Sequence, residues 1–141
     1  MINIENKVFN DIATALTTEY PNISVVSEYV DTPNTFPCVT IVEDDNSVHQ
    51  NSLDNTNVEH HANLMYSVNV YSNKRSGKKQ EAKAIMGSID NLMSAMKFTR
   101  TMCMQTPNID RTIYRITARY TAIVERGRAD GDNTVYQIYR R

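Results

Sequence analysis

Residues 113–128 read IYRITARYTAIVERGR, and apolar and polar side chains alternate along this run with a period of two. Because side chains alternate between the two faces of a β-strand, this period predicts one long strand over residues 112–125. One face is a normal core face, and the other is mostly polar and carries two arginines. Since a core face must be covered, the chain must build at least two layers. The core face carries Tyr114, Ile116, Ala118, Tyr120, Ala122 and Val124, and the polar face carries Ile113, Arg115, Thr117, Arg119, Thr121 and Ile123.

Two stretches place apolar residues at helical spacing and can supply the second layer. The spacing predicts one helix over about residues 4–19, capped by Asn3 and stopped by Pro21, and another over about residues 78–96. Each stripe is apolar on one side only, so each helix must lie on another layer. The stripes are Ile4, Val8, Ile12 and Leu16 in the first helix, and Ala82, Ile85, Ile89, Leu92 and Met96 in the second.

The remaining apolar runs are short and β-like, and they complete the expected fold. Strands are predicted at residues 23–27, 36–43, 63–72 and 98–105, and the closing VYQIYRR can add a last strand after a turn over 126–133. The order α, β, β, β, α, β, β predicts an α+β fold, a mostly antiparallel sheet with two helices packed on one face. We expect residues 1–126 to form a single domain and residues 127–141 to form a flexible C-terminal extension.

The connection over residues 44–60 is polar and rich in Asn, Asp and Ser. A 17-residue connection is long for a compact domain. It is either a protruding β-hairpin-like loop or a segment that becomes ordered on a partner, and long loops are often functional. The candidate docking residues in this loop are His49, Leu53, Asp54 and Val58.

Charge is distributed unevenly along the chain, although the net charge is only −1. Residues 1–73 carry a net charge of −9, residues 74–119 carry +7, and residues 120–141 carry +1. Such asymmetry can mark two complementary surfaces for head-to-tail association, or a basic patch for phosphate, or the two stretches can intermingle and cancel.

No motif in the sequence supports catalysis, so we expect a protein that is not an enzyme and binds no cofactor. None of the four glycines forms a phosphate-binding motif, and both cysteines lack a catalytic partner motif. His60 and His61 are adjacent, so on a strand they point to opposite faces and are not expected to share a metal. Cys38 and Cys103 lie in apolar stretches, and we expect two buried thiols in a reducing compartment.

Several segments together resemble a known family. These are FPCVTIVEDDN, the long polar loop, NLMYSVNVYSNKRSGKKQEAKAIMGSIDNLMSAMKFTRT, and PNIDRTIYRITARYTAIVE. In this order they resemble the tail terminator proteins of long-tailed bacteriophages, also called tail completion or head–tail joining proteins. The resemblance covers roughly residues 1–126, and RGRADGDNTVYQIYRR is less clearly part of it.

The resemblance implies a non-enzymatic virion protein located where tail and head meet and assembled in the cytoplasm of the bacterial host. The implied subunit forms a hexameric ring that caps the tail tube, ends its polymerisation and joins it to the head connector. Its implied partners are further copies of itself, the tail tube protein, the connector or head-completion protein, and genomic DNA passing through the ring, with no membrane. The alternatives are a head-closure, minor capsid or tail-tube protein of the same virion, or a small non-specific nucleic-acid-binding module.

Charged side chains are the candidates for contacts of such a ring. Arg115 and Arg119 should lie on the helix-free side of the sheet, where they contact a neighbouring subunit, line the channel or meet solvent. If its strand pairs suitably, Arg100 extends them into a basic stripe. The acids at 43–45 are expected to form a solvated cluster at a strand end. The candidates for subunit or lumen contacts are Arg100, Arg115, Arg119, Lys78, Lys79, Lys83, Glu43, Asp44 and Asp45, and the C-terminal docking candidates are Arg126, Arg128, Tyr136 and Tyr139.

Overall fold

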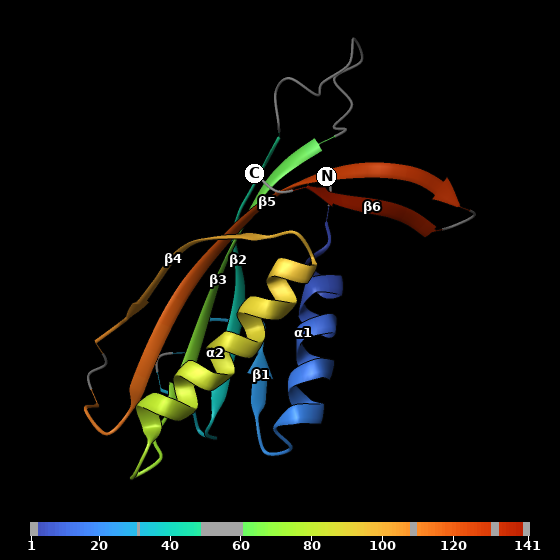
Figure 1. Ribbon diagram of the computed structural model, residues 1–141. Helices are drawn as coiled ribbons and strands as arrows, with labels where there is room; N and C mark the ends of the chain where they lie inside the picture. Colours follow the sequence, from blue (N-terminus) through green and yellow to red (C-terminus); the bar gives the residue numbers. More distant parts are fainter. Residues whose placement is uncertain (1–2, 31, 49–60, 108–109, 131–132, 140–141) are drawn as a thin grey trace.

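The chain forms two layers, a six-stranded sheet and two helices that both lie on one face of it (Figure 1). The computed structural model describes residues 3–30, 32–48, 61–107, 110–130 and 133–139. This α+β arrangement, with two helices on one face of a mostly antiparallel sheet, confirms the fold predicted from the sequence. The elements in chain order are α1 (Glu5–Glu19), β1 (Ser24–Val26), β2 (Cys38–Val48), β3 (His61–Ser72), α2 (Lys78–Ala95), β4 (Thr99–Gln105), β5 (Tyr114–Asp130) and β6 (Asn133–Tyr139).

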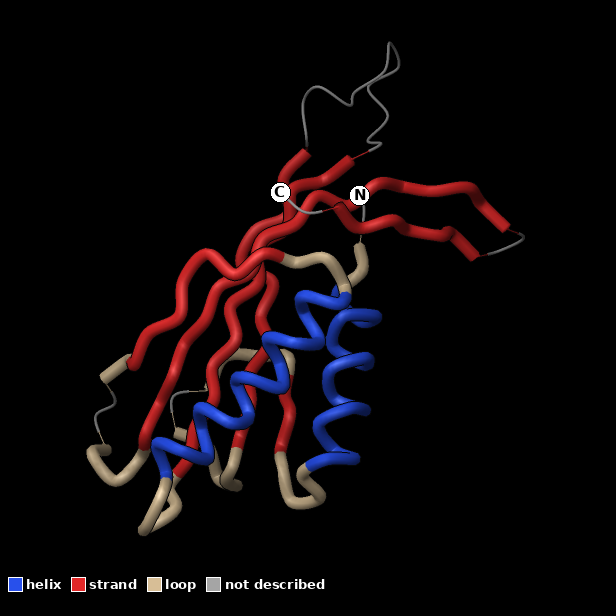
Figure 2. The backbone as a smooth tube through the Cα atoms, viewed as in Figure 1, coloured by secondary structure: helices blue, strands red, loops and turns tan. Residues whose placement is uncertain are grey.

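Five strands lie side by side in the order β1-β2-β3-β5-β4, and β6 pairs with the far part of β5 (Figure 2). Every pair is antiparallel except β1 with β2, which is parallel. The long central strands β3 and β5 pair without interruption from His61 opposite Glu125 to Ser72 opposite Tyr114. Cross-strand partners share a face, so this register aligns the core faces of the two strands.

The main core lies between the sheet and the helices. α1 buries Val8, Ile12 and Leu16, and α2 contributes its own stripe of five buried residues. All six core-face residues predicted in β5 are buried, with at most 7% of each exposed. Burying one large aliphatic side chain contributes about 1.5–3 kcal/mol, so the two stripes hold the layers together. The buried residues of α2 are Ala82, Ile85, Met86, Ile89 and Met93.

Local signals set the helix ends. The backbone N–H of Glu5 donates to Asn3 Oδ1 at 3.1 Å, which satisfies one of the free donors at the start of α1. α2 begins after Gly77, whose φ of 87° is in the left-handed region that favours glycine. At its other end Lys97 has a φ of 69°, and the N–H of Phe98 donates to the Met93 carbonyl at 2.9 Å. This closure resembles a Schellman motif and turns the chain directly into β4.

Two strands run further than the sequence predicted. β2 continues to Val48 across a register shift between Glu43 and Asp45, so residues 44–48 belong to a strand and not to the loop. Residues 126–130, predicted as a turn, continue β5, because their backbone pairs with β6 across a second register shift. The predicted last strand is confirmed as β6. The connection over residues 49–60 lies outside the described residues, so its expected hairpin form stays a prediction.

The helix-free face of the sheet is less open than predicted. A segment that we call the strap, residues 27–37 except residue 31, crosses it between β1 and β2. Beneath it, a second small core forms around buried Cys38, Tyr71 and Ile113. The Tyr71 hydroxyl donates to the Val30 carbonyl at 2.9 Å, which fixes the strap to β3. The prediction that this face is mostly polar and wet is therefore wrong where the strap covers it.

Candidate functional site

A hollow of about 400 Å³ opens on the helix-free face, and we call it the arginine hollow. The strap forms one wall, and residues of β2, β3 and β5 form the rest. Because alternate residues of neighbouring strands meet on one face, the register alone gathers most of its lining. The lining residues are Tyr29, Val42, Asp44, Met65, Ser67, Asn69, Arg115, Thr117 and Arg119.

Arg115 connects the strap to the sheet. Its Nε donates to Asn69 Oδ1 at 3.0 Å, and its guanidinium carbon lies 5.5 Å from the ring centre of Tyr29 and 5.3 Å from that of Tyr71. Such cation–π contacts contribute about 0.5–2 kcal/mol each, depending on how dry they are. Asn69, only 4% exposed, also accepts the Thr117 hydroxyl at 2.6 Å. Arg115 is therefore held in place by residues of its own chain.

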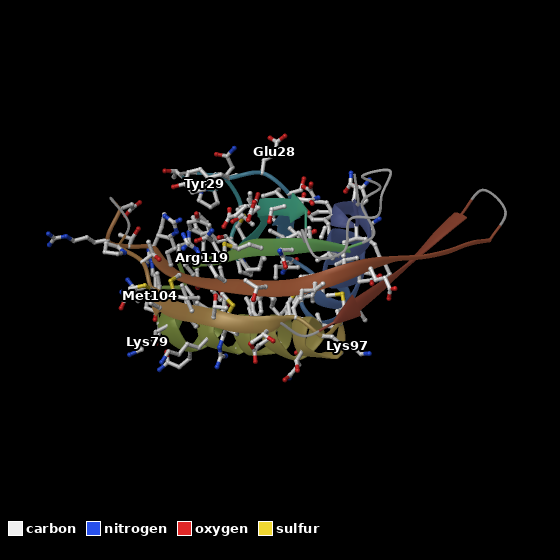
Figure 3. All side chains as sticks on the ribbon, turned by 90° about the horizontal axis from the view of Figure 1, so that it is seen from above. Glu28, Tyr29, Lys79, Lys97, Met104 and Arg119 are labelled. Carbon is white, nitrogen blue, oxygen red and sulfur yellow. The ribbon has the colours of Figure 1, made fainter. Side chains whose placement is uncertain are left out.

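Arg119 differs from Arg115, although both lie on the same face of the same strand. It is exposed and pairs across the ladder with Ser67. Within the described part of the chain its guanidinium makes no hydrogen bond and no ion pair. Figure 3 shows Arg119 and Tyr29 on one side of the sheet and Lys79 on the side of α2. The hollow therefore presents one cation that has no partner among these residues.

The three neighbouring acids do not form the cluster that the sequence predicted. Glu43 and Asp44 are consecutive in β2 and therefore face opposite sides of the sheet, and the register shift between Glu43 and Asp45 brings Asp45, opposite Met65, to the same side as Asp44. Asp44 lines the arginine hollow and accepts the Ser67 hydroxyl through Oδ2, whereas Glu43 lies opposite Tyr66, a residue of the main core. Asp45 is exposed opposite Met65. The expected loop cluster is thus wrong, and only Asp44 of the three lines the hollow.

Glu43 sits in an unfavourable position for a charge. The Tyr66 hydroxyl donates to Glu43 Oε1 at 3.1 Å, and the Tyr66 side chain is fully buried. Burial raises the pKa of the Glu43 carboxyl above its usual value, and the nearby acids Glu5 and Asp45 raise it further, while the bond from Tyr66 opposes them. Glu43 is thus a structural carboxyl at the edge of the core.

Arg100 does not join Arg115 and Arg119 in a basic stripe. It pairs across the ladder with Tyr120 and so shares the helix side of the sheet, before β4 shifts register between Arg100 and Met102. There its Nη1 lies 3.2 Å from Asp90 Oδ1, and the Tyr120 hydroxyl donates to the same oxygen at 3.0 Å. Burial first, and then the bond to Asp90, raises the pKa of Tyr120 far above its usual value.

The three lysines of α2 also lie apart from the hollow. Lys78 Nζ donates to the Arg111 carbonyl at 3.1 Å, which ties the start of α2 to the turn before β5. Lys79 and Lys83 are exposed on the helix layer. The basic residues of the chain are therefore divided between both layers.

The remaining candidates lie where no side chain is described. His49, Leu53, Asp54 and Val58 lie outside the described residues. Of the C-terminal candidates only the backbone is described, which places Arg126 and Arg128 in β5 and the two tyrosines in β6. Their docking roles stay predictions. The two tyrosines are Tyr136 and Tyr139.

Six of the nine lining residues were not among the sequence candidates, and two of these six, Asn69 and Tyr29, contact Arg115. Asn69 could have been recognised from the sequence, since asparagine is depleted in strands and here interrupts a run rich in valine. Tyr29 lies in an irregular segment without any period, so nothing in the sequence placed it over Arg115.

The two cysteines differ in their surroundings. Cys38 is buried, and this burial raises the pKa of its thiol, as expected for an inert core residue. Cys103 is exposed on β4, next to Met104, which is 55% exposed. The prediction of two buried thiols is therefore wrong for Cys103, because β4 is an edge strand without helix cover over most of its length.

Across the described ranges, no three His, Cys, Asp or Glu side chains are placed to hold a metal ion. No helix in that part of the chain is long and apolar enough to cross a membrane. No protein-family model matches the chain, and no curated protein matches it either.

Proposed function

We propose that the protein is a non-enzymatic subunit of a bacteriophage virion that assembles into a ring and terminates the tail. The ring, a hexamer in this proposal, caps the tail tube, ends its polymerisation and joins it to the head connector, and DNA passes through its centre. The segments that resemble tail terminator proteins support this proposal. The family's small α+β subunit is also compatible with the observed order of helices and strands.

The observation that carries the proposal is the one-sided cover of the sheet. The resembling segments form β2, β3, α2, β4 and β5, and both helices pack on one face (Figure 1). The opposite face and the β5–β6 ribbon, which extends beyond the helices in Figure 1, are left as contact surfaces. A closed ring needs two different patches on each subunit that fit one another. A helix-free face and a projecting ribbon supply two such patches.

Electron microscopy and native mass spectrometry of the purified protein, alone and mixed with tail tubes, test the proposal. We expect six-fold rings, and rings seated on tube ends that block further growth of the tubes. A protein that stays monomeric with tubes and never enters virions would contradict the proposal. Rings found only on heads would favour a head-closure protein instead.

A matched pair of chains tests the contribution of the ribbon. Removing residues 131–141 deletes β6 and leaves the two-layer body, so we expect folded protein by circular dichroism with impaired ring formation. The control is Lys74→Gln, which alters an exposed side chain before α2 and should leave the rings unchanged. Normal rings from the shortened chain would remove the ribbon from the proposed interface.

A further inference from the structure

Arg115 and Arg119 lie at the same hollow but differ in their contacts. Arg115 is occupied by Asn69 and by two tyrosine rings of its own subunit, and it holds the strap. Arg119 is exposed at the same hollow and makes no polar bond to any described residue. Of these two arginines, only Arg119 has no partner within the described ranges and can therefore recognise one.

The other lining residues restrict what that partner can be. Guanidinium pairs with a carboxylate or a phosphate through two parallel hydrogen bonds. Asp44 lines the same hollow, and Asp45 is exposed on the same strand, so a chain of phosphates would meet repulsion there. A protein segment carries single carboxylates among neutral amides, and its backbone N–H groups can donate to Asp44.

The shape of the hollow suits a side chain with an apolar stem. Val42 and Met65 line it together with Tyr29, whose ring is 56% exposed despite its contact with Arg115. The methylene groups of a glutamate can pack on these side chains while its carboxylate reaches Arg119. A volume of about 400 Å³ accommodates one or two residues of an extended segment.

We propose that the arginine hollow is a docking site for an acidic segment of a partner protein, with one carboxylate of that segment paired to Arg119. That partner is a neighbouring copy of this chain, whose residues 1–73 carry a net charge of −9, and this assignment rests on the proposed function. The preference for a carboxylate over a phosphate rests only on the hollow.

The preference can be measured on the isolated full-length protein by ¹H–¹⁵N NMR titration at low salt. The probes are a terminally blocked hexapeptide with a single glutamate among glutamines, hexaglutamine of equal length, and the oligonucleotide dT6. We expect the single-glutamate peptide to shift the amide signals of Ser67, Thr117 and Arg119, and hexaglutamine to shift none of them. dT6 should bind at least tenfold more weakly than the single-glutamate peptide.

Two variants of equal charge change make the test specific. Arg119→Gln should weaken binding of the single-glutamate peptide at least tenfold, while Lys79→Gln, on the opposite layer, should leave it unchanged. Equal binding by dT6, equal binding by hexaglutamine, or equal losses in both variants would overturn the proposal.

The outcome separates this inference from the proposed function. Six-fold rings without carboxylate binding would overturn the docking site and leave the ring intact. Carboxylate binding at Arg119 by a protein that never forms rings would retain the site and refute the tail terminator.

Discussion

The Tyr120→Phe substitution removes one hydroxyl from the contact between α2 and the two strands β4 and β5. Tyr120 lies on the core face of β5, almost fully buried, and its hydroxyl donates to Asp90 Oδ1 of α2 at 3.0 Å. The same oxygen lies 3.2 Å from Arg100 Nη1 of β4. One carboxylate thus connects three elements, and Tyr120 supplies the buried part of the connection.

The expected loss follows from the surroundings of that bond. A hydrogen bond to a charged group contributes about 1.5–3 kcal/mol net. Asp90 is partly exposed and keeps Arg100 and water as partners, so we expect a loss at or slightly below the bottom of this range, about 1–2 kcal/mol. Phenylalanine retains the ring packing, so no cavity term is added. For a chain of this length the loss corresponds to a decrease in Tm of roughly 3–8 °C.

Urea unfolding at pH 7, followed by circular dichroism, measures the change in the free energy of unfolding. Tyr114→Phe is the matched control, because Tyr114 is buried on the same face of β5 and its hydroxyl has no hydrogen-bond partner within the described ranges. We expect the control to change stability by less than about 0.5 kcal/mol. Equal effects of the two substitutions, or no effect of Tyr120→Phe, would refute the assigned role of the Asp90 bond.

Three further predictions follow from single residues. Glu43→Gln should raise the Tm at pH 7 but not below about pH 4. The raised pKa of Glu43 gives stability at low pH that is lost as the pH rises from 4.5 upward, and glutamine has no charge to bury. Thermal unfolding at both pH values checks this, and an equal gain in Tm at both would contradict it. Ellman's reagent should modify one thiol quickly in the folded protein and both thiols in urea. The fast-reacting thiol should be absent in Cys103→Ser and present in Cys38→Ser. Two fast-reacting thiols in the folded protein would disprove the burial of Cys38. Gly77→Ala should lower the free energy of unfolding by about 1 kcal/mol, because Gly77 has a positive φ. Gly87→Ala, inside α2 with open space around it, should raise the free energy of unfolding by about 0.5–1 kcal/mol. If urea unfolding gave changes of the same sign, the backbone conformation at Gly77 would not explain its effect.

The sites of interaction were only partly predictable from the sequence. The alternation in β5 correctly placed Arg115 and Arg119 on the helix-free face, because side-chain direction along a strand depends on local geometry alone. It could not show that Arg115 is enclosed by Tyr29 and Tyr71, while the side chain of Arg119 has no partner among the described residues. That difference depends on the path of the strap, an irregular segment that no period describes.

The faces of Arg100 and Asp45 were decided by register. A bulge shifts side-chain direction by one residue, and it forms where two strands distant in sequence are paired. The tertiary structure therefore placed Arg100 beside Asp90 of α2 and brought Asp45 to the face of Asp44, whereas Glu43 lies on the other face by strand alternation alone. Neither the expected basic stripe nor one cluster of three acids forms.

The amino-acid sequence by itself determined the two helices, the strand order along the chain and the core faces, because hydrophobic periods of 3.6 and 2 are local properties of the chain. Strand neighbours, register shifts and the position of the strap required the tertiary structure, because they depend on contacts between residues far apart in sequence. The arginine hollow is a product of those contacts. Its lining comes from the strap and from three strands that only the folded sheet brings side by side.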